Sequence, residues 1–141
     1  MAHDVGRLRF SLLLLRLSVF LVMVMWTVDK FINHAHAARV FENFYGIGGL
    51  GPAAVYAIGA VEMLVLVAFL VGYRKTYSYG AVLAFHGVST LSAFKQYLQP
   101  FEGANLLFFA AWPMLAACLA LFLLRAYDGM LSVESPPRHS G

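Results

Sequence analysis

Four long apolar stretches constrain the fold of this chain more than any other feature of its sequence. A helix needs about 20 mostly apolar residues to cross the hydrocarbon core of a bilayer. The stretches that meet this length lie at about residues 10–28, 53–71, 77–95 and 106–124. Because 61% of the residues are hydrophobic and 12% are charged, little of the chain remains for a soluble domain. We therefore expect an all-α fold: an integral membrane, left-handed antiparallel four-helix bundle that forms a single domain over residues 1–131.

Two segments outside these stretches carry separate predictions. Segment 31–45 contains no Pro or Gly and spaces its apolar residues among polar ones, which predicts a short interfacial helix in the first outer loop. The glycine-rich segment 46–52 ends this helix. Residues 132–141 contain Pro136 and Pro137 and predict a disordered cytoplasmic tail.

The basic residues next to the apolar stretches predict the orientation of the bundle. One side holds Arg7, Arg9, Arg74, Lys75 and Arg125, and the other holds Lys30, Arg39 and Lys95. The side richer in Lys and Arg faces the cytoplasm, which places both termini there in a multi-pass protein of the cell inner membrane. This topology also explains the net charge of +3, which therefore does not indicate a nucleic-acid partner.

A cleaved signal peptide is the alternative for the N-terminus, because Ala35-His36-Ala37 is an A-x-A triplet that follows a basic start and an apolar run. The core of a signal peptide has roughly 7–15 apolar residues, and this run is longer. Arg16 also interrupts it. We expect the first span to remain in the protein.

Three ionisable residues lie well inside separate apolar stretches: Arg16, Glu62 and His86. A charge in hydrocarbon costs from about 2.5 to more than 10 kcal/mol, so such residues usually face the bundle interior and find partners. Glu62 and His86 lie near the middle of their stretches, and Arg16 lies about 5 Å to the cytoplasmic side of the middle of its own. One buried polar cluster of all three residues is therefore geometrically allowed.

The first apolar stretch also carries an outer polar track. Arg16, Met23 and Lys30 are spaced by seven residues, and Thr27 lies on nearly the same side of the helix. Thr27 and Lys30 therefore extend the polar stripe from the outer surface towards the bilayer centre. At the outer mouth, Lys30 would meet Glu42, Glu102 or the end of the third span at Lys95.

Three interpretations of the buried charges remain open. Arg16 extends to the inner interface and leaves Glu62 neutral and hydrogen-bonded. Alternatively, Arg16 and Glu62 form a structural ion pair that sets the register of the helices. In the third interpretation, the buried polar residues handle protons, an ion or a quinol headgroup.

The cofactor question also stays open. His86 is the only histidine inside an apolar stretch, which does not favour haem, whereas a quinone is compatible because Glu62 and His86 can accept quinol protons. His34 and His36 form an H-x-H pair in the outer loop, and without a nearby Cys or further His this pair does not establish a metal site. Cys118 is the only cysteine, so no intramolecular disulfide forms, and we expect it to pack as a small hydrophobe.

Several short motifs extend over about residues 10–128. Arg16 lies within the first span, Trp26 to Phe31 close it, Glu62 lies in the second span, and Gly72-Tyr73-Arg74 follow at its inner end. In these features the chain resembles the DoxX-like family of small four-helix membrane proteins. The resemblance implies four spans with both ends in the cytoplasm. The family is named after a small subunit of a terminal quinol oxidase, and relatives are linked to thiosulfate oxidation, thiol stress and receptor assembly.

These observations favour two classes of function. The first is an accessory subunit or assembly factor of a larger membrane complex, with a quinol-linked redox complex as the candidate. The second is a small homodimeric transporter or proton-linked channel that uses the buried Glu62. Catalysis stays open, but the residues favour a chain that is non-catalytic by itself, because no serine, cysteine or metal set accompanies the buried polar trio. The expected partners are the lipid bilayer and either other membrane subunits or a second copy, with no nucleic acid.

Overall fold

The computed structural model describes residues 1–134, which fold into helices and turns with no strand in that range. In chain order the elements are α1 (Ala2–Ile32), α2 (His34–Tyr45), α3 (Pro52–Leu70), α4 (Lys75–Ser92), α5 (Phe94–Leu98), the 3-10 helix η1 (Asn105–Ala110) and α6 (Ala111–Leu123). The all-α prediction is confirmed. Three helical stretches are long and apolar enough to cross a membrane: α1, α3 and the η1–α6 stretch.

The helix bounds differ from the predicted spans where local chemistry extends or interrupts a helix. α1 has 31 residues and continues through polar residues on both sides of the predicted span 10–28. The third predicted span, 77–95, is interrupted at Ala93, which separates α4 from α5. In the fourth, 106–124, the 3-10 turn η1 precedes α6, and Pro113 in the first turn of α6 offers no N–H to the preceding carbonyls.

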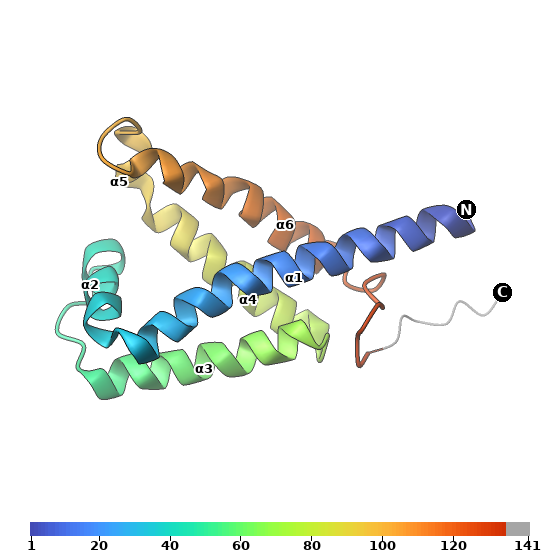
Figure 1. The fold of residues 1–141 in the computed structure, drawn as a ribbon, viewed down its shortest axis with the longest axis horizontal. Coiled ribbons are helices and arrows are strands. Elements are labelled where there is room, and N and C mark those ends of the chain that lie inside the picture. The colour runs from blue at the N-terminus through green and yellow to red at the C-terminus, as the bar shows by residue number, and fades with distance from the viewer. Residues whose placement is uncertain (135–141) are drawn as a thin grey trace.

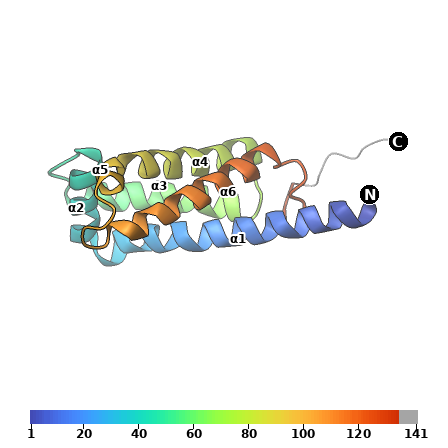
Figure 2. The same cartoon turned by 90° about the horizontal axis from the view of Figure 1, so that it is seen from above.

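Two helix pairs form a V, as Figure 1 shows. α1 packs against α3 and α4 against α6, while α3 also contacts α4 and α1 also contacts α6. The pairs converge near the turn between α3 and α4, which we call the narrow end, and diverge towards α2 and α5, which we call the open end. Figure 2 shows that α1, α3, α4 and α6 all run roughly along the long dimension of the molecule, with α6 inclined to the others. α2 lies at the open end and confirms the predicted helix in the first loop.

Glycines allow close approach within both pairs. A Cβ on Gly59 of α3 would lie 2.9 Å from the ring of Phe31, and a Cβ on Gly80 of α4 would lie 3.4 Å from the ring of Phe122. Small residues at such positions let membrane helices pack without the help of expelled water. Gly59 and Gly80 are therefore positions where a larger side chain would disturb the contacts made by α3 and α4.

The buried core lies towards the narrow end. Its members come from all four long helices, and Cys118 packs among them as expected: Leu12, Val19, Leu66, Phe69, Tyr79, Val82, Cys118 and Leu121. Aromatic packing adds to this core, because the rings of Phe69 and Tyr79 meet edge to face with their centroids 4.9 Å apart. The narrow end is therefore the packed part of the molecule.

Candidate functional site

Arg16 is fully buried at the narrow end, where it forms a cluster with Tyr79 and Asp128. Its Nη1 lies 3.4 Å from Oδ2 of Asp128 and donates a 3.1 Å hydrogen bond to the hydroxyl of Tyr79. Tyr79 in turn donates a 2.7 Å bond to Oδ2 of Asp128, whose side chain is also fully buried. The second guanidinium nitrogen donates to the carbonyl oxygens of Met130 and Leu131. We call Arg16, Tyr79 and Asp128 the Arg16 cluster.

The carbonyl partners of Arg16 belong to a strap, residues 124–134, that folds back after α6. The backbone N–H of Val133 donates a 2.8 Å bond to the carbonyl of Val71, and the hydroxyl of Ser132 approaches the carbonyl of Gly72. The last three residues of this strap, 132–134, were expected to belong to the disordered tail. In the structure they bond to the turn between α3 and α4, and residues 135–141 of the predicted tail lie outside the described residues.

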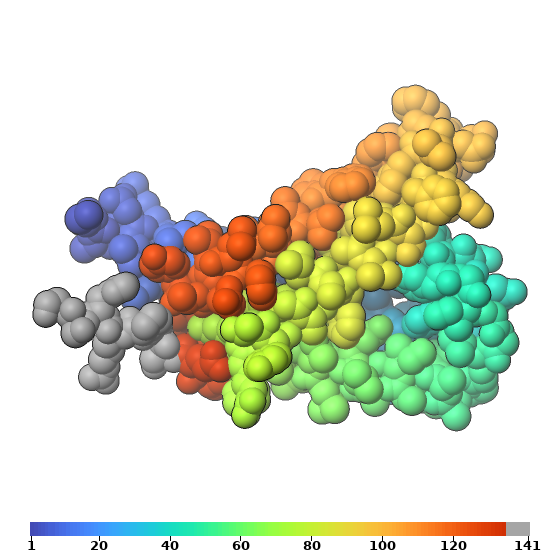
Figure 3. All heavy atoms as spheres, turned by 180° about the vertical axis from the view of Figure 1, so that it is seen from behind, coloured from blue at the N-terminus to red at the C-terminus, as the bar shows by residue number. Residues whose placement is uncertain are grey.

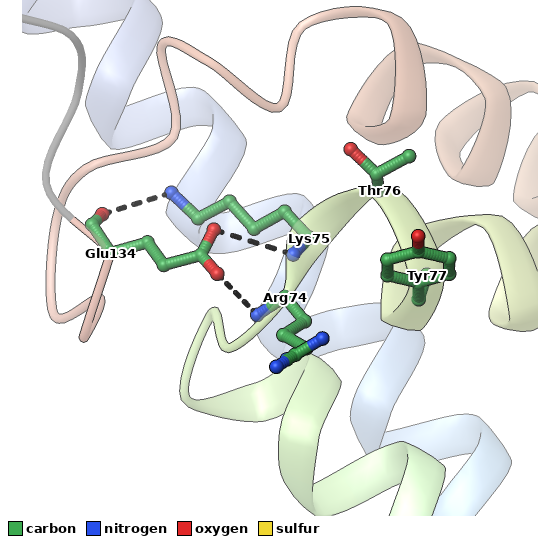
Figure 4. A pocket seen from close by; sticks show the side chains of 5 residues that line it. All are labelled: Arg74, Lys75, Thr76, Tyr77 and Glu134. Carbon is green, nitrogen blue, oxygen red and sulfur yellow. Dashed lines mark hydrogen bonds between the residues drawn. The ribbon is translucent and has the colours of Figure 1, made fainter.

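Glu134 joins the strap to the start of α4, as Figure 4 shows. Its carboxylate accepts hydrogen bonds from the backbone N–H groups of Arg74 and Lys75, which have no partner within the helix. The ammonium of Lys75 donates to the carbonyl oxygens of Asp128 and Glu134. The strap thus ties α1, the α3–α4 turn and α4 together.

Glu62 forms a second cluster, with Thr27 and Lys30, nearer the open end. The ammonium of Lys30 lies 2.9 Å from Oε2 of Glu62, and Thr27 donates a 3.0 Å bond to the same oxygen. Lys30 also donates to the carbonyl of Trp26 at 3.4 Å and lies over the ring of Phe41. The side chains of Lys30 and Glu62 are 11% and 23% exposed, in contrast to the sealed Arg16 cluster. We call Thr27, Lys30 and Glu62 the Glu62 cluster.

His86 bonds to α6 rather than to either cluster. Its Nε2 lies 2.9 Å from the carbonyl oxygen of Ala111 and 3.2 Å from the hydroxyl of Thr90. Thr90 donates its own proton to the backbone carbonyl of His86 at 2.7 Å. The imidazole is therefore oriented by contacts from two helices.

The structure does not bring Arg16, Glu62 and His86 into one cluster. Arg16 lies beside Gly72, because its Nη1 would be 3.1 Å from a Cβ at that position. Gly72 follows Glu62 by ten residues, a separation of about 15 Å along a helix. The two charges therefore find other partners at their own depths. Asp128, which the sequence interpretation overlooked, lies beyond the last apolar stretch and reaches Arg16 only because the strap folds back.

Thr27 and Lys30, the two residues of the predicted outer polar track, both lie next to Glu62. Thr27 and Lys30 both bond to Glu62, so the ammonium of Lys30 pairs with this carboxylate and not with the expected Glu42 or Glu102. The stripe on α1 therefore leads to Glu62 near Lys30, while Arg16 lies near the middle of α1, beside Gly72 in the α3–α4 turn.

The outer histidines are engaged in pairwise contacts. His36 lies 2.6 Å from the carboxylate of Asp29 and stacks on Trp26, and His34 contacts Tyr56. Within residues 1–134 no group of three or more His, Cys, Asp and Glu side chains is arranged to hold a metal ion. These contacts tie α2 to α1 and α3.

A cavity of about 900 Å³ opens between the two helix pairs at the open end. Figure 3 shows the hollow in the surface between α2 and α4 from behind. Its walls are mostly apolar and include Val22, Met23, Trp26, Val40, Phe41, Phe44, Phe85, Leu107, Phe108 and Met114. The Glu62 cluster lies on one wall, and His86 and Ser89 lie on the wall formed by α4. The divergence of the pairs thus creates an apolar space with polar groups on opposing sides.

The chain matches no protein-family model, no curated protein and no solved structure. Its function is therefore inferred from the chemistry of the cavity. Sites for small ligands typically enclose about 300–1,000 Å³, with apolar walls and a few polar groups that orient the ligand. The cavity at the open end has these properties.

Proposed function

We propose that the chain is a four-span membrane protein that binds a quinol-like amphiphile and serves as an accessory subunit of a larger membrane complex. The cavity at the open end is the observation that carries this proposal. Its apolar walls suit a ring with a hydrocarbon tail, and the Glu62 cluster and His86 supply hydrogen-bonding groups for the polar head. The DoxX-like resemblance agrees with this assignment.

The four-span arrangement rests on the course of α4. This helix runs from the narrow end back to the open end beside α3 and α6, so it covers the same length as its neighbours. Its 18 residues extend about 27 Å, close to the hydrocarbon thickness of about 30 Å. α4 is less apolar than its neighbours because it carries Lys75, His86 and several hydroxyl residues. The positive-inside rule supports an orientation in which the narrow end faces the cytoplasm, in agreement with the topology expected from the sequence.

The accessory role rests on how the buried charges are used. The charges of Arg16 and Glu62 are neutralised by Asp128 and Lys30, an arrangement that suits stability and ligand orientation. A chain that holds a quinol without a redox centre in its sequence motifs would present the ligand to a partner subunit. We therefore place the electron-transfer chemistry in the partner.

Trp26 offers a direct test, because it lines the cavity whereas Trp112, the only other tryptophan, is not among the lining residues. In a Trp112→Phe background reconstituted in nanodiscs, a short-tailed ubiquinol should quench Trp26 fluorescence in a saturable manner. Ser89→Phe adds a bulky ring to the cavity wall beside His86 and should weaken the saturable quenching, while Ser92→Phe, one turn away outside the lining, should not. Linear, unsaturable quenching in the parent protein would refute the proposal.

A homodimeric proton-linked transporter remains the second candidate, because Glu62 lies on the cavity wall and is partly exposed. In that case the purified chain alone would move protons with its substrate across liposomes. Substrate-driven proton flux, together with purification free of any partner, would replace the accessory role. Lack of flux in liposomes that still bind the quinol favours the accessory role.

A further inference from the structure

We propose that the cavity selects the reduced, hydroxyl-bearing form of its ligand, through hydrogen-bond acceptors at His86 Nδ1 and Glu62 Oε1. This inference rests on the proposed quinol-binding function and adds its redox specificity. A hydroquinone carries two O–H donors at opposite positions of its ring, whereas the corresponding quinone carries none. Acceptors on opposing walls of one cavity therefore distinguish the two forms.

The contacts of His86 determine which of its ring nitrogens carries the proton. The carbonyl of Ala111 can only accept, so Nε2, 2.9 Å away, must be the N–H. The hydroxyl of Thr90 gives the same result, because its proton goes to the carbonyl of His86 and its oxygen can then only accept from Nε2. In the neutral imidazole, Nδ1 is then left with a lone pair and acts as an acceptor.

Glu62 provides the second acceptor from the opposite wall. The ion pair with Lys30 and the hydrogen bond from Thr27 both use Oε2. Within residues 1–134 Oε1 has no hydrogen-bond donor, so it keeps its capacity to accept. The charge of the carboxylate is already balanced by Lys30, so the site suits a neutral hydroxyl rather than a cationic head.

The expected selectivity follows from what a quinone would leave unpaired. A ligand without O–H groups loses the bonds to Nδ1 and Oε1 while it keeps all its apolar contacts. One hydrogen bond changes stability by about 0.5–1.5 kcal/mol, which corresponds to up to about tenfold in affinity. Two such bonds together correspond to about 5–150-fold, so we expect the quinol to bind more tightly than the quinone of the same tail length by a factor in that range.

The test compares a short-tailed ubiquinol with its quinone by quenching of Trp26 in the Trp112→Phe background, under anaerobic conditions. His86→Phe removes the acceptor at Nδ1 but leaves the one at Glu62 Oε1, so it should lower the preference for the quinol to that of a single hydrogen bond, at most about tenfold, and leave the quinone affinity unchanged. His86→Gln retains a donor and an acceptor and should keep most of the preference. His34→Phe, a histidine outside the cavity lining, is the matched control and should behave like the parent.

The outcomes separate this inference from the proposed function. Equal affinities for quinol and quinone in the parent protein, with both weakened by Ser89→Phe, would leave the cavity as the binding site and overturn the selectivity. Binding of neither form would overturn both. The comparison in the parent protein requires no substitution at His86, so the inference stays testable if a variant fails to fold.

Discussion

The narrow and the open ends of the V contain the same chemical arrangement in two different surroundings. Each has a cation, a carboxylate and a hydroxyl that donates to the carboxylate: Arg16, Asp128 and Tyr79 at one end, and Lys30, Glu62 and Thr27 at the other. The first carboxylate is fully buried, while the second is 23% exposed on a cavity wall. The two ends contain the same residue types, so the exposure of the ion pair to the cavity decides whether it can contact a ligand or serves only the fold.

The largest expected effect is the loss of the carboxylate at the narrow end. Asp128→Asn leaves the guanidinium of Arg16 without a counter-charge in a fully buried position. Breaking a buried ion pair from one side typically costs about 3–5 kcal/mol. The thermal midpoint in detergent should fall strongly, whereas Asp4→Asn at the exposed N-terminus should leave it nearly unchanged.

Removal of both charges provides the control for this prediction. Arg16→Met combined with Asp128→Leu eliminates the stranded charge, so much of the lost stability should return. If Asp128→Asn alone has no measurable effect, Arg16 reaches water or another partner and the narrow end is not sealed as described.

The next prediction compares two glycines that both have a positive φ angle, in the left-handed region of backbone conformation. Gly72 at the narrow end has φ +65°, and Gly46 at the open end has φ +68°. A Cβ on Gly46 would meet nothing within 4 Å, whereas one on Gly72 would lie 2.3 Å from the hydroxyl of Ser132 in the strap. Gly46→Ala should cost about 1 kcal/mol from backbone strain, and Gly72→Ala about 1–3 kcal/mol more from overpacking.

Chemical denaturation of both alanine variants measures this difference in the free energy of unfolding. Equal costs at the two glycines would show that the strap moves aside easily. In that case the narrow end would be no more tightly packed than the open end.

Glu62→Gln should have a smaller effect on stability than Asp128→Asn. The ammonium of Lys30 loses its charged partner but keeps access to water at the cavity and a bond to Trp26. A hydrogen bond to a charged group contributes about 1.5–3 kcal/mol, and partial exposure lowers the expected cost to about 1–2 kcal/mol. The thermal midpoint in the same detergent gives the comparison. A loss as large as that of Asp128→Asn would mean that the open end is equally structural.

The apolar stretches predicted the helices well because hydrophobic length is a local property of the sequence. The stripe of Thr27 and Lys30 on α1 also pointed towards a polar site, and both residues indeed bond to Glu62. Helical periodicity indicates which residues share one face of a helix. It does not indicate which residue of another helix lies opposite that face.

The partner of Arg16 could not be predicted for this reason. The sequence-based estimate assumed that the middles of all four apolar stretches lie at the same depth in the membrane. In the structure α1 has 31 residues, and Arg16 lies at the level of the α3–α4 turn. Asp128 reaches it through a strap whose course depends on tertiary contacts. The cavity was also hidden, because it results from the divergence of two helix pairs, which no single stretch of sequence encodes.

The smallest effect concerns Glu134, which connects the strap to α4. Its carboxylate accepts from the N–H groups of Arg74 and Lys75, at the positive end of the helix dipole. Glu134→Gln keeps an oxygen acceptor but removes the charge, so the cost should be about 0.5–1 kcal/mol and should shrink as salt is added. The free energy of unfolding of the parent and the variant, measured at low and at high ionic strength, gives this cost. A salt-independent loss comparable to that of Asp128→Asn would mean that the strap, rather than the Arg16 cluster, holds the narrow end closed.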